Sequence, residues 1–109
     1  MSASPAELSI VIPTFNESGN LRELVERIRQ ALPEVAWEIV FVDDNSPDGT
    51  AQVARELYAA ESRVRCIRRV GRRGLAGACI EGMLSSSAPI VAVMDADLQH
   101  DEALLPQML

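Results

Sequence analysis

The sequence predicts an α/β fold in which a mostly parallel sheet of about four strands is flanked by helices. Two observations lead to this fold class. Runs with the character of buried strands alternate with amphipathic helical stretches along the 109 residues, which is typical of strand–helix–strand units with right-handed crossovers. Polar clusters also follow three of the predicted strands. Because ligands bind beyond the carboxyl ends of parallel strands, these clusters are expected to open onto one edge of the sheet.

The first strand and the first helix are predicted within residues 8–32. Residues 8–12 are a short apolar run, which predicts a strand that Pro13 ends. The helix is predicted from apolar residues at helical spacing, namely Leu21, Leu24, Val25, Ile28 and Leu32. Either Ser18 or Asn20 could cap this helix, the latter with Glu23 in a capping box.

The remainder of the chain continues the alternation. Strands are predicted over residues 37–42, 64–68 and 90–94, and a helix is predicted over residues 50–60. Another helix is predicted from the stripe of Leu75, Ala78, Cys79, Gly82 and Met83. Residues 101–109 resemble the start of a further helix. We therefore expect a single domain over residues 1–109, with residues 1–7 as a disordered N-terminal tail.

The composition is that of an ordinary globular protein, with 48% hydrophobic and 24% charged residues. The net charge of −6 argues against nucleic acid as a general partner. The start of the chain lacks the features of a signal peptide, and no apolar run approaches the roughly 18 residues of a membrane span. Cys66 and Cys79 have neither metal-ligand nor Cys-x-x-Cys spacing, so we expect reduced, buried thiols and a cytoplasmic location.

The strongest motif follows the last predicted strand. Asp95 and Asp97 are spaced i, i+2, and in an extended chain such side chains point the same way. With the amide oxygen of Gln99 they form a set of hard oxygen ligands, which suits Mg²⁺ or Mn²⁺ rather than Zn²⁺. The alternative is a strand followed by a polar turn. His100 could be a further ligand or a solvent-facing residue at a helix start.

A second polar cluster, residues 43–49, follows the second predicted strand. Its last four residues, Ser-Pro-Asp-Gly, are residue types that favour a β-turn, so Asp48 can be explained as a turn residue. Turn chemistry does not explain Asp43 and Asp44 at the strand end. Like charges placed so close raise each other's pKa unless a cation or hydrogen-bond donors relieve them. A carboxylate at this position can also accept hydrogen bonds from a ribose hydroxyl or a base N–H.

Two further segments have both a functional and a structural interpretation. Residues 13–17 either stop a strand and cap a helix, or present Phe15 to a base and Glu17 to a base edge or hydroxyl. Residues 68–77 are the only basic stretch; they combine guanidinium groups, glycines and a helix start, which suits a diphosphate, or they form a solvated surface loop. Their glycine spacing is not that of the dinucleotide-binding fingerprint.

Four segments together resemble family 2 glycosyltransferases of the GT-A fold. They are Ile-Pro-Thr-Phe-Asn-Glu (12–17), Val-Asp-Asp-Asn-Ser-Pro-Asp-Gly-Thr (42–50), Arg-Gly-Leu-Ala-Gly-Ala (73–78) and Met-Asp-Ala-Asp-Leu-Gln-His (94–100). Within that family the segments are most similar to those of dolichol-phosphate mannosyltransferases and other polyprenyl-phosphate glycosyltransferases. The resemblance is specific because four motifs occur in order over nearly the whole chain.

The resemblance implies a Rossmann-like, GT-A nucleotide-binding half and a set of site residues. Asp95 and Asp97 would be catalytic and, with Gln99, would hold the Mg²⁺ or Mn²⁺ that bridges the donor diphosphate. The implied contacts to the nucleotide-sugar are Pro13, Phe15, Glu17, Val42, Asp44, Met94 and Ala96. Phe15 occupies a position where many relatives have tyrosine, which keeps the ring and loses a hydroxyl.

The activity that the resemblance implies is metal-dependent, inverting transfer of a sugar from a nucleotide-sugar, of the GDP-mannose or UDP-glucose type, to a polyprenyl or dolichyl phosphate. Catalytic domains of this family run to about twice this length, so we expect a truncated domain that supplies only the donor site. A full-length protein is expected at a membrane surface, at the cytoplasmic face, and a homodimer is possible. The alternatives are an inactive nucleotide-binding module and a haloacid-dehalogenase-type phosphatase with Asp95 as nucleophile.

Overall fold

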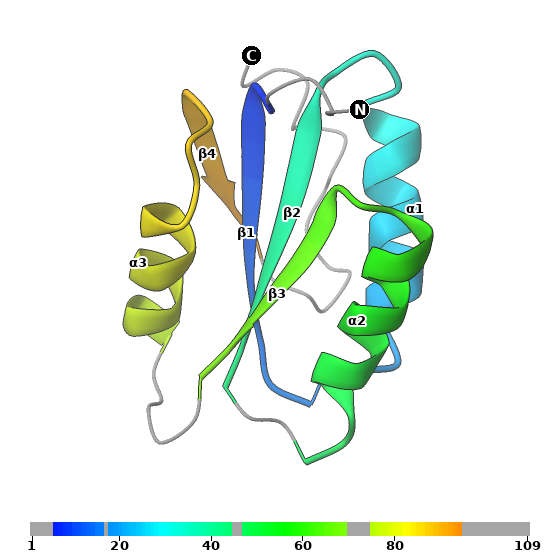
Figure 1. Ribbon diagram of the computed structural model, residues 1–109, viewed down its shortest axis with the longest axis vertical. Helices are drawn as coiled ribbons and strands as arrows, with labels where there is room; N and C mark the ends of the chain where they lie inside the picture. The colour runs from blue at the N-terminus through cyan, green and yellow to red at the C-terminus, as the bar shows by residue number, and fades with distance from the viewer. Residues whose placement is uncertain (1–5, 17, 45–46, 70–74, 95–109) are drawn as a thin grey trace.

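The computed structural model of the chain describes residues 6–16, 18–44, 47–69 and 75–94. In this part of the chain strands and helices alternate strictly (Figure 1). The elements are β1 (Leu8–Thr14), α1 (Leu21–Ala31), β2 (Trp37–Asp43), α2 (Thr50–Ala60), β3 (Val64–Arg68), α3 (Leu75–Leu84) and β4 (Ile90–Val93). The predicted α/β fold is therefore confirmed, and α2 and β3 have the predicted bounds.

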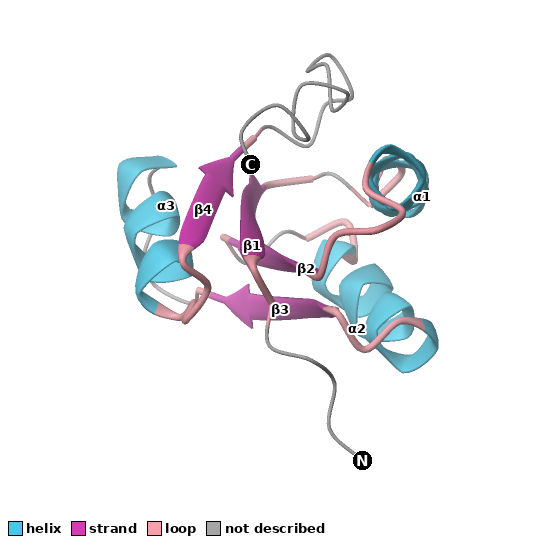
Figure 2. Cartoon of the chain, turned by 90° about the horizontal axis from the view of Figure 1, so that it is seen from above, coloured by secondary structure: helices cyan, strands magenta, loops and turns pink. Residues whose placement is uncertain are grey.

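The four strands form one parallel sheet in the order β3-β2-β1-β4. Helices α1 and α2 cover one face of the sheet and α3 covers the other, as the two perpendicular views show (Figures 1 and 2). After β3 the chain crosses over the sheet and adds β4 on the far side of β1. The strand order thus reverses between β1 and β4, which is where α/β sheets bind ligands, at the carboxyl ends of the strands.

Strand β1 continues past the predicted end at Pro13 and includes Thr14, so the prediction of a stop at proline is wrong. The Val11 carbonyl accepts from the N–H of Met94 at 3.1 Å, and the Thr14 carbonyl accepts from the N–H of Asp44, also at 3.1 Å. Because hydrogen-bonding sides alternate along a strand, the nitrogen of Pro13 faces the β4 side. The register with β4 ends at Val11 and Val93, so the missing N–H interrupts none of the described β1–β4 pairs.

The predicted capping of α1 is also wrong. Asn20 is the N-cap residue, but its backbone is helical and its side chain makes no capping hydrogen bond. A side-chain cap requires a non-helical backbone at that position, so the capping box cannot form. Ser18 donates hydrogen bonds to Asp48 rather than to α1. At the start of α2, Gly49 adopts a left-handed conformation (φ 88°), which glycine tolerates without strain.

The core has two layers, one on each face of the sheet. The layer beneath α1 and α2 is the larger and includes Trp37, Phe41 and alternate residues of β1, each fully buried or nearly so. The layer beneath α3 consists of Val11, Val40, Val42 and Ala78, with Ile67 packed against it. Such alternation along β1 and β2 is what a sheet covered on both faces requires.

The remaining predictions about organisation meet the structure only in part. Glu7, within the predicted tail, donates its backbone N–H to the Ala36 carbonyl at 2.7 Å, whereas residues 1–5 and the predicted helix over 101–109 lie outside the described residues. Cys66 and Cys79 are free and half-buried, on opposite faces of the sheet. Within the described ranges, no helix is both long and apolar enough to cross a membrane.

Candidate functional site

A pocket of about 170 Å³ lies at the carboxyl ends of β1 and β2, beside the amino-terminal half of α3. Its lining residues are Pro13, Thr14, Phe15, Asp44 and Ala78. The structure therefore brings together Pro13, Phe15 and Asp44, as expected for clusters that follow neighbouring parallel strands. Thr14 and Ala78 were not predicted. Ala78 is placed here only by the crossover that carries α3 over the sheet.

Phe15 gives this pocket an exposed aromatic surface. Phe15 is 42% exposed, although it directly follows the buried strand β1. The next residue, Asn16, has a left-handed backbone (φ 57°) that turns the chain sharply away from the strand. Asparagine is among the few residues other than glycine that adopt this conformation readily. The turn thus leaves the ring at the mouth of the pocket, where a flat ligand could stack on it.

The adjacent carboxylates Asp43 and Asp44 lie on opposite faces of the sheet. Asp43 is fully buried, and its Oδ1 accepts a hydrogen bond from the Thr14 hydroxyl at 2.9 Å. Asp44 lies on the α3 side, where its side chain is 14% exposed and lines the pocket. Because neighbouring side chains alternate along a strand, the like charges are separated and each receives its own donor or cation.

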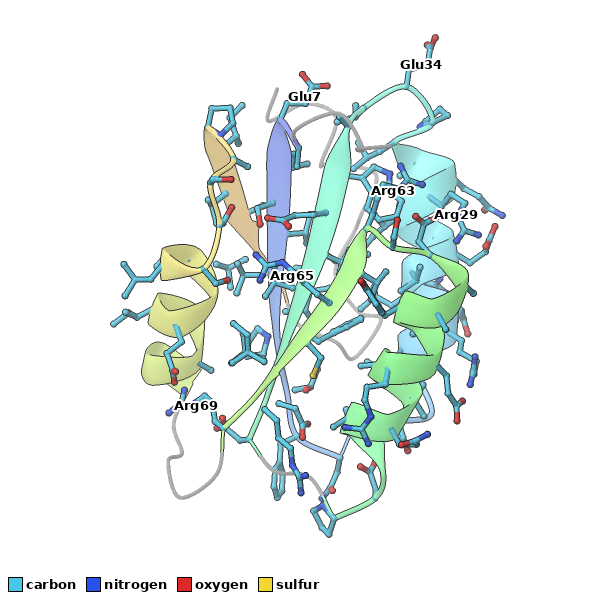
Figure 3. The ribbon with its side chains drawn as sticks, in the orientation of Figure 1. Glu7, Arg29, Glu34, Arg63, Arg65 and Arg69 are labelled. Carbon is cyan, nitrogen blue, oxygen red and sulfur yellow. The ribbon has the colours of Figure 1, made fainter. Side chains whose placement is uncertain are left out.

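The cation beside Asp44 is Arg69, whose side chain is only 4% exposed. Its Nε atom lies 3.3 Å from Asp44 Oδ1 and 2.8 Å from Glu81 Oε2. Figure 3 shows Arg69 where β3 ends, next to α3. Arg69 is therefore a buried residue beside the pocket-lining Asp44, and the interpretation of this position as part of a solvated loop is wrong. Residues 70–74 of that stretch lie outside the described part of the chain.

A second set of contacts joins the loops that follow β1 and β2. Ser18 donates to Asp48 Oδ2 from its backbone N–H at 3.2 Å and from its hydroxyl at 2.9 Å. Thr50 donates to Asp48 Oδ1 through its backbone N–H, at 3.1 Å, and through its hydroxyl. Desolvation raises the pKa of Asp48, but these hydrogen bonds outweigh it and hold the pKa below its ordinary value of 3.8.

We expect this contact to make stability depend on pH in the acid range. A carboxyl group whose pKa is lowered by folding stabilises the fold fully above its unfolded-state pKa, and that contribution disappears as the pH falls through the folded-state pKa. The Asp48→Ala variant should therefore be less stable than the wild type above pH 4. The difference should shrink below the ordinary pKa of 3.8, as measured by urea unfolding at several pH values.

Glu34 provides a matched control for this experiment. It is an exposed acidic residue in the loop between α1 and β2, and its side chain points away from the fold (Figure 3). Glu34→Ala should leave the stability nearly unchanged at every pH. An Asp48→Ala effect of constant size down to pH 3 would contradict the assignment of the contact to the ionised carboxylate.

The other predicted site residues divide into two groups. The first group, Val42 and Met94, lies within the described residues, and both side chains are buried. The Val42 side chain lies beneath α3, so a ligand could reach this residue only through its backbone. The Met94 side chain lies on the opposite face of the sheet, in the α1–α2 layer. The second group lies outside the described residues and comprises Glu17, Asp95, Ala96, Asp97 and Gln99. Among the described residues, no group of three or more His, Cys, Asp and Glu side chains could hold a metal ion.

The sequence also matches a known family. Residues 9–109 match the family model described as glycosyl transferase family 2. The chain belongs to this family. Its membership confirms the resemblance seen in the motifs and sets aside the phosphatase alternative.

Curated relatives of the chain carry a more specific name. It is 45% identical to the dolichol-phosphate mannosyltransferase of Pyrococcus furiosus over 103 residues, which is 94% of this chain and 29% of the relative. It is 35% identical to the dolichol-phosphate mannosyltransferase of Saccharomyces cerevisiae, over 94% of this chain and 39% of the relative. The chain therefore spans between 29% and 39% of the length of these relatives.

Solved structures confirm the GT-A fold. A mannosyltransferase from Pyrobaculum calidifontis, in complex with GDP-Man and Mn²⁺, superposes with a TM-score of 0.71 and 25% identity, over 86% of this chain and 28% of that chain. Glucosyl-3-phosphoglycerate synthase from Mycobacterium tuberculosis, in complex with UDP, superposes with a TM-score of 0.68 and 24% identity, over 94% of this chain and 38% of that chain. The second similarity is one of fold alone.

Proposed function

We propose that this chain carries the donor site of a metal-dependent, inverting glycosyltransferase that moves a hexose from a nucleotide-sugar to polyprenyl or dolichyl phosphate. The observation that carries the proposal is the pocket at the carboxyl ends of β1 and β2, which combines the exposed ring of Phe15 with the carboxylate of Asp44. Membership of glycosyl transferase family 2 and two relatives named dolichol-phosphate mannosyltransferase support it.

The described residues suit recognition of a nucleoside. The ring of Phe15 offers a face on which a base can stack, and stacking is tolerant of base identity. The Asp44 carboxylate, an acceptor when ionised, can receive a base N–H or a ribose hydroxyl. Ala78, which lines the pocket beside them, has only a small side chain. These groups orient the nucleoside part of the donor.

Asp95, Asp97 and Gln99 are the proposed ligands of Mg²⁺ or Mn²⁺. Their donor set consists of two carboxylates and an amide oxygen, which fits a hard divalent cation. When bound, the cation would neutralise the charge that develops on the diphosphate leaving group. A phosphate acceptor is already anionic at neutral pH, so the attack on the anomeric carbon requires no strong general base and inverts its configuration. The mannosyltransferase from Pyrobaculum calidifontis was solved with Mn²⁺.

The lipid acceptor would place the full-length enzyme at a membrane surface, for which we propose the cytoplasmic face. The second candidate is a module that binds the nucleotide without turnover, for which the pocket that Phe15 and Asp44 line would be sufficient. Binding and transfer are therefore best measured separately.

Calorimetric titration of the chain with GDP and with UDP, in the presence and absence of Mn²⁺, tests the proposal. We expect one of the two nucleotides to bind, with an affinity that Mn²⁺ increases. In the presence of Mn²⁺, the Asp97→Ala variant should bind this nucleotide about tenfold more weakly or worse. Asp101→Ala, a nearby carboxylate outside the proposed ligand set, is the matched control. Absence of binding to either nucleotide by a sample with a cooperative thermal transition would overturn the proposal.

A further inference from the structure

We infer that Arg69 is a positioning residue of the nucleotide pocket, because its buried guanidinium, held between Asp44 and Glu81 and seated against Gly77, fixes the Asp44 carboxylate at the pocket wall. The inference rests on the proposed function and deepens it, since it concerns how the same pocket presents its acidic group to a nucleoside. No part of it requires Arg69 to touch the ligand.

The burial of Arg69 calls for an explanation beyond stability. Arginine is almost never fully buried unless it is paired, and this side chain is 4% exposed. Its partners are Asp44, at 3.3 Å, and Glu81, at 2.8 Å, measured from Nε to the carboxylate oxygen. The desolvation of a buried ion pair commonly offsets its attraction, so an apolar side chain would serve a purely structural purpose as well. A buried charge at this position therefore points to control of geometry.

The backbone holds Arg69 in place from two sides. Its N–H donates to the Asp43 carbonyl at 2.7 Å, which continues the β2–β3 ladder one residue beyond β3. The guanidinium lies against the α3 backbone at Gly77, where an added Cβ would come within 3.0 Å of Nη2 and 3.2 Å of Nη1. A methyl group at residue 77 would press on the guanidinium and require it to move by a few tenths of an ångström. Glycine at this position thus leaves the guanidinium its present place against α3.

The charges explain how this arrangement would orient Asp44. Arg69 carries one positive charge between two carboxylates, those of Asp44 and Glu81, and its planar head restricts the directions from which they approach. The Nε atom lies 2.8 Å from Glu81 Oε2 and 3.3 Å from Asp44 Oδ1, so both carboxylates are attracted to the same guanidinium. Without the guanidinium, Asp44 and Glu81 would repel each other, and the Asp44 carboxylate would lose its fixed orientation.

A double-mutant cycle on nucleotide affinity tests the inference. Arg69→Met removes the charge and keeps the length, and it should weaken binding of the preferred nucleotide by about tenfold. Asp44→Asn should weaken binding by a similar factor, and the double variant should be no weaker than Asp44→Asn alone, because Arg69 acts through Asp44. Arg68→Met, the exposed neighbour on the opposite face, should bind like the wild type. Independent, multiplying losses would overturn the inference.

Gly77→Ala is the second variant, in case Arg69→Met fails to fold. It improves the helix propensity of α3 but pushes on the guanidinium, so it should weaken binding while the melting temperature is maintained. Backbone amide NMR spectra without nucleotide complete the test. In the Arg69→Met variant, the amide signals of the pocket residues Thr14, Phe15 and Ala78 should shift. In the Arg68→Met variant, the same signals should keep their wild-type positions. If these signals shift but the wild type binds neither GDP nor UDP, the proposed function fails and the role of Arg69 in positioning Asp44 is retained. If the wild type binds a nucleotide but the signals do not shift, the positioning role of Arg69 is overturned.

Discussion

Trp37→Ala is expected to lower the free energy of unfolding by about 3–5 kcal/mol, a large share of the stability of a domain this small. Trp37 begins β2 and is 1% exposed. It is the largest side chain of the α1–α2 layer, so truncation leaves a cavity that the neighbouring strands cannot close. The guanidinium carbon of Arg63 lies 3.7 Å from the ring centroid, and that cation–π contact is lost as well. Urea unfolding monitored by circular dichroism measures the change.

Trp37→Phe is the informative control. The indole Nε1 atom is buried and has no hydrogen-bond partner among the described residues, so phenylalanine removes a polar group whose burial is unfavourable. The variant still loses ring area, but its destabilisation should be less than about half that of alanine. An equal loss in both variants would contradict this expectation.

Gly82→Ala is expected to destabilise the protein by about 2 kcal/mol, although alanine is normally the better helix former by about 1 kcal/mol. An added Cβ at Gly82 would lie 2.3 Å from Val11 Cγ1 and 3.1 Å from Val42 Cγ2. Both valines are fully buried in the layer beneath α3, so neither can move aside freely. Helix α3 would have to lift away from β1 and β2, which would also disturb Ala78 at the pocket.

The combination of Gly82→Ala with Val11→Ala separates this clash from a general loss of stability. Removing the Val11 methyl groups makes room for the new Cβ, so the double variant should be more stable than the sum of the two single changes predicts. Gly19→Ala is the matched control, since a Cβ at Gly19 meets nothing within 4 Å. Strict additivity of the two changes would contradict the steric explanation.

The elements were predictable because each strand and helix carries its own periodic pattern. The stripe from Leu21 to Leu32 needs no tertiary information to be read as a helix, and the apolar runs of β1 and β2 likewise indicate buried strands. The errors occurred where a neighbour decided the outcome. Pro13 remains in β1 because its nitrogen faces the side on which pairing with β4 has ended, and Ser18 contacts Asp48 in place of capping α1.

Part of the candidate site was predictable for a related reason. Phe15 and Asp44 directly follow strands, and parallel strands bring their carboxyl ends to one edge, so local sequence and topology together were sufficient to expect them in one place. The placement of Ala78 and Glu81 required the crossover of α3, which no local pattern encodes. The prediction for residues 95–99 rests on their motif, and its test is the Asp97→Ala titration.

The sequence alone determined the order of strands and helices, because periodicity acts over a few residues. It also determined that acidic and aromatic residues lie at strand ends, because turn chemistry is equally local. Only the tertiary structure decided the role of Arg69. A basic residue beside glycines is typical of a solvated loop or a phosphate site, yet here it is buried between Asp44 and Glu81. The physical reason is that one partner directly follows β2 and the other lies in α3. Only folding places these two carboxylates close enough to compensate a desolvated charge.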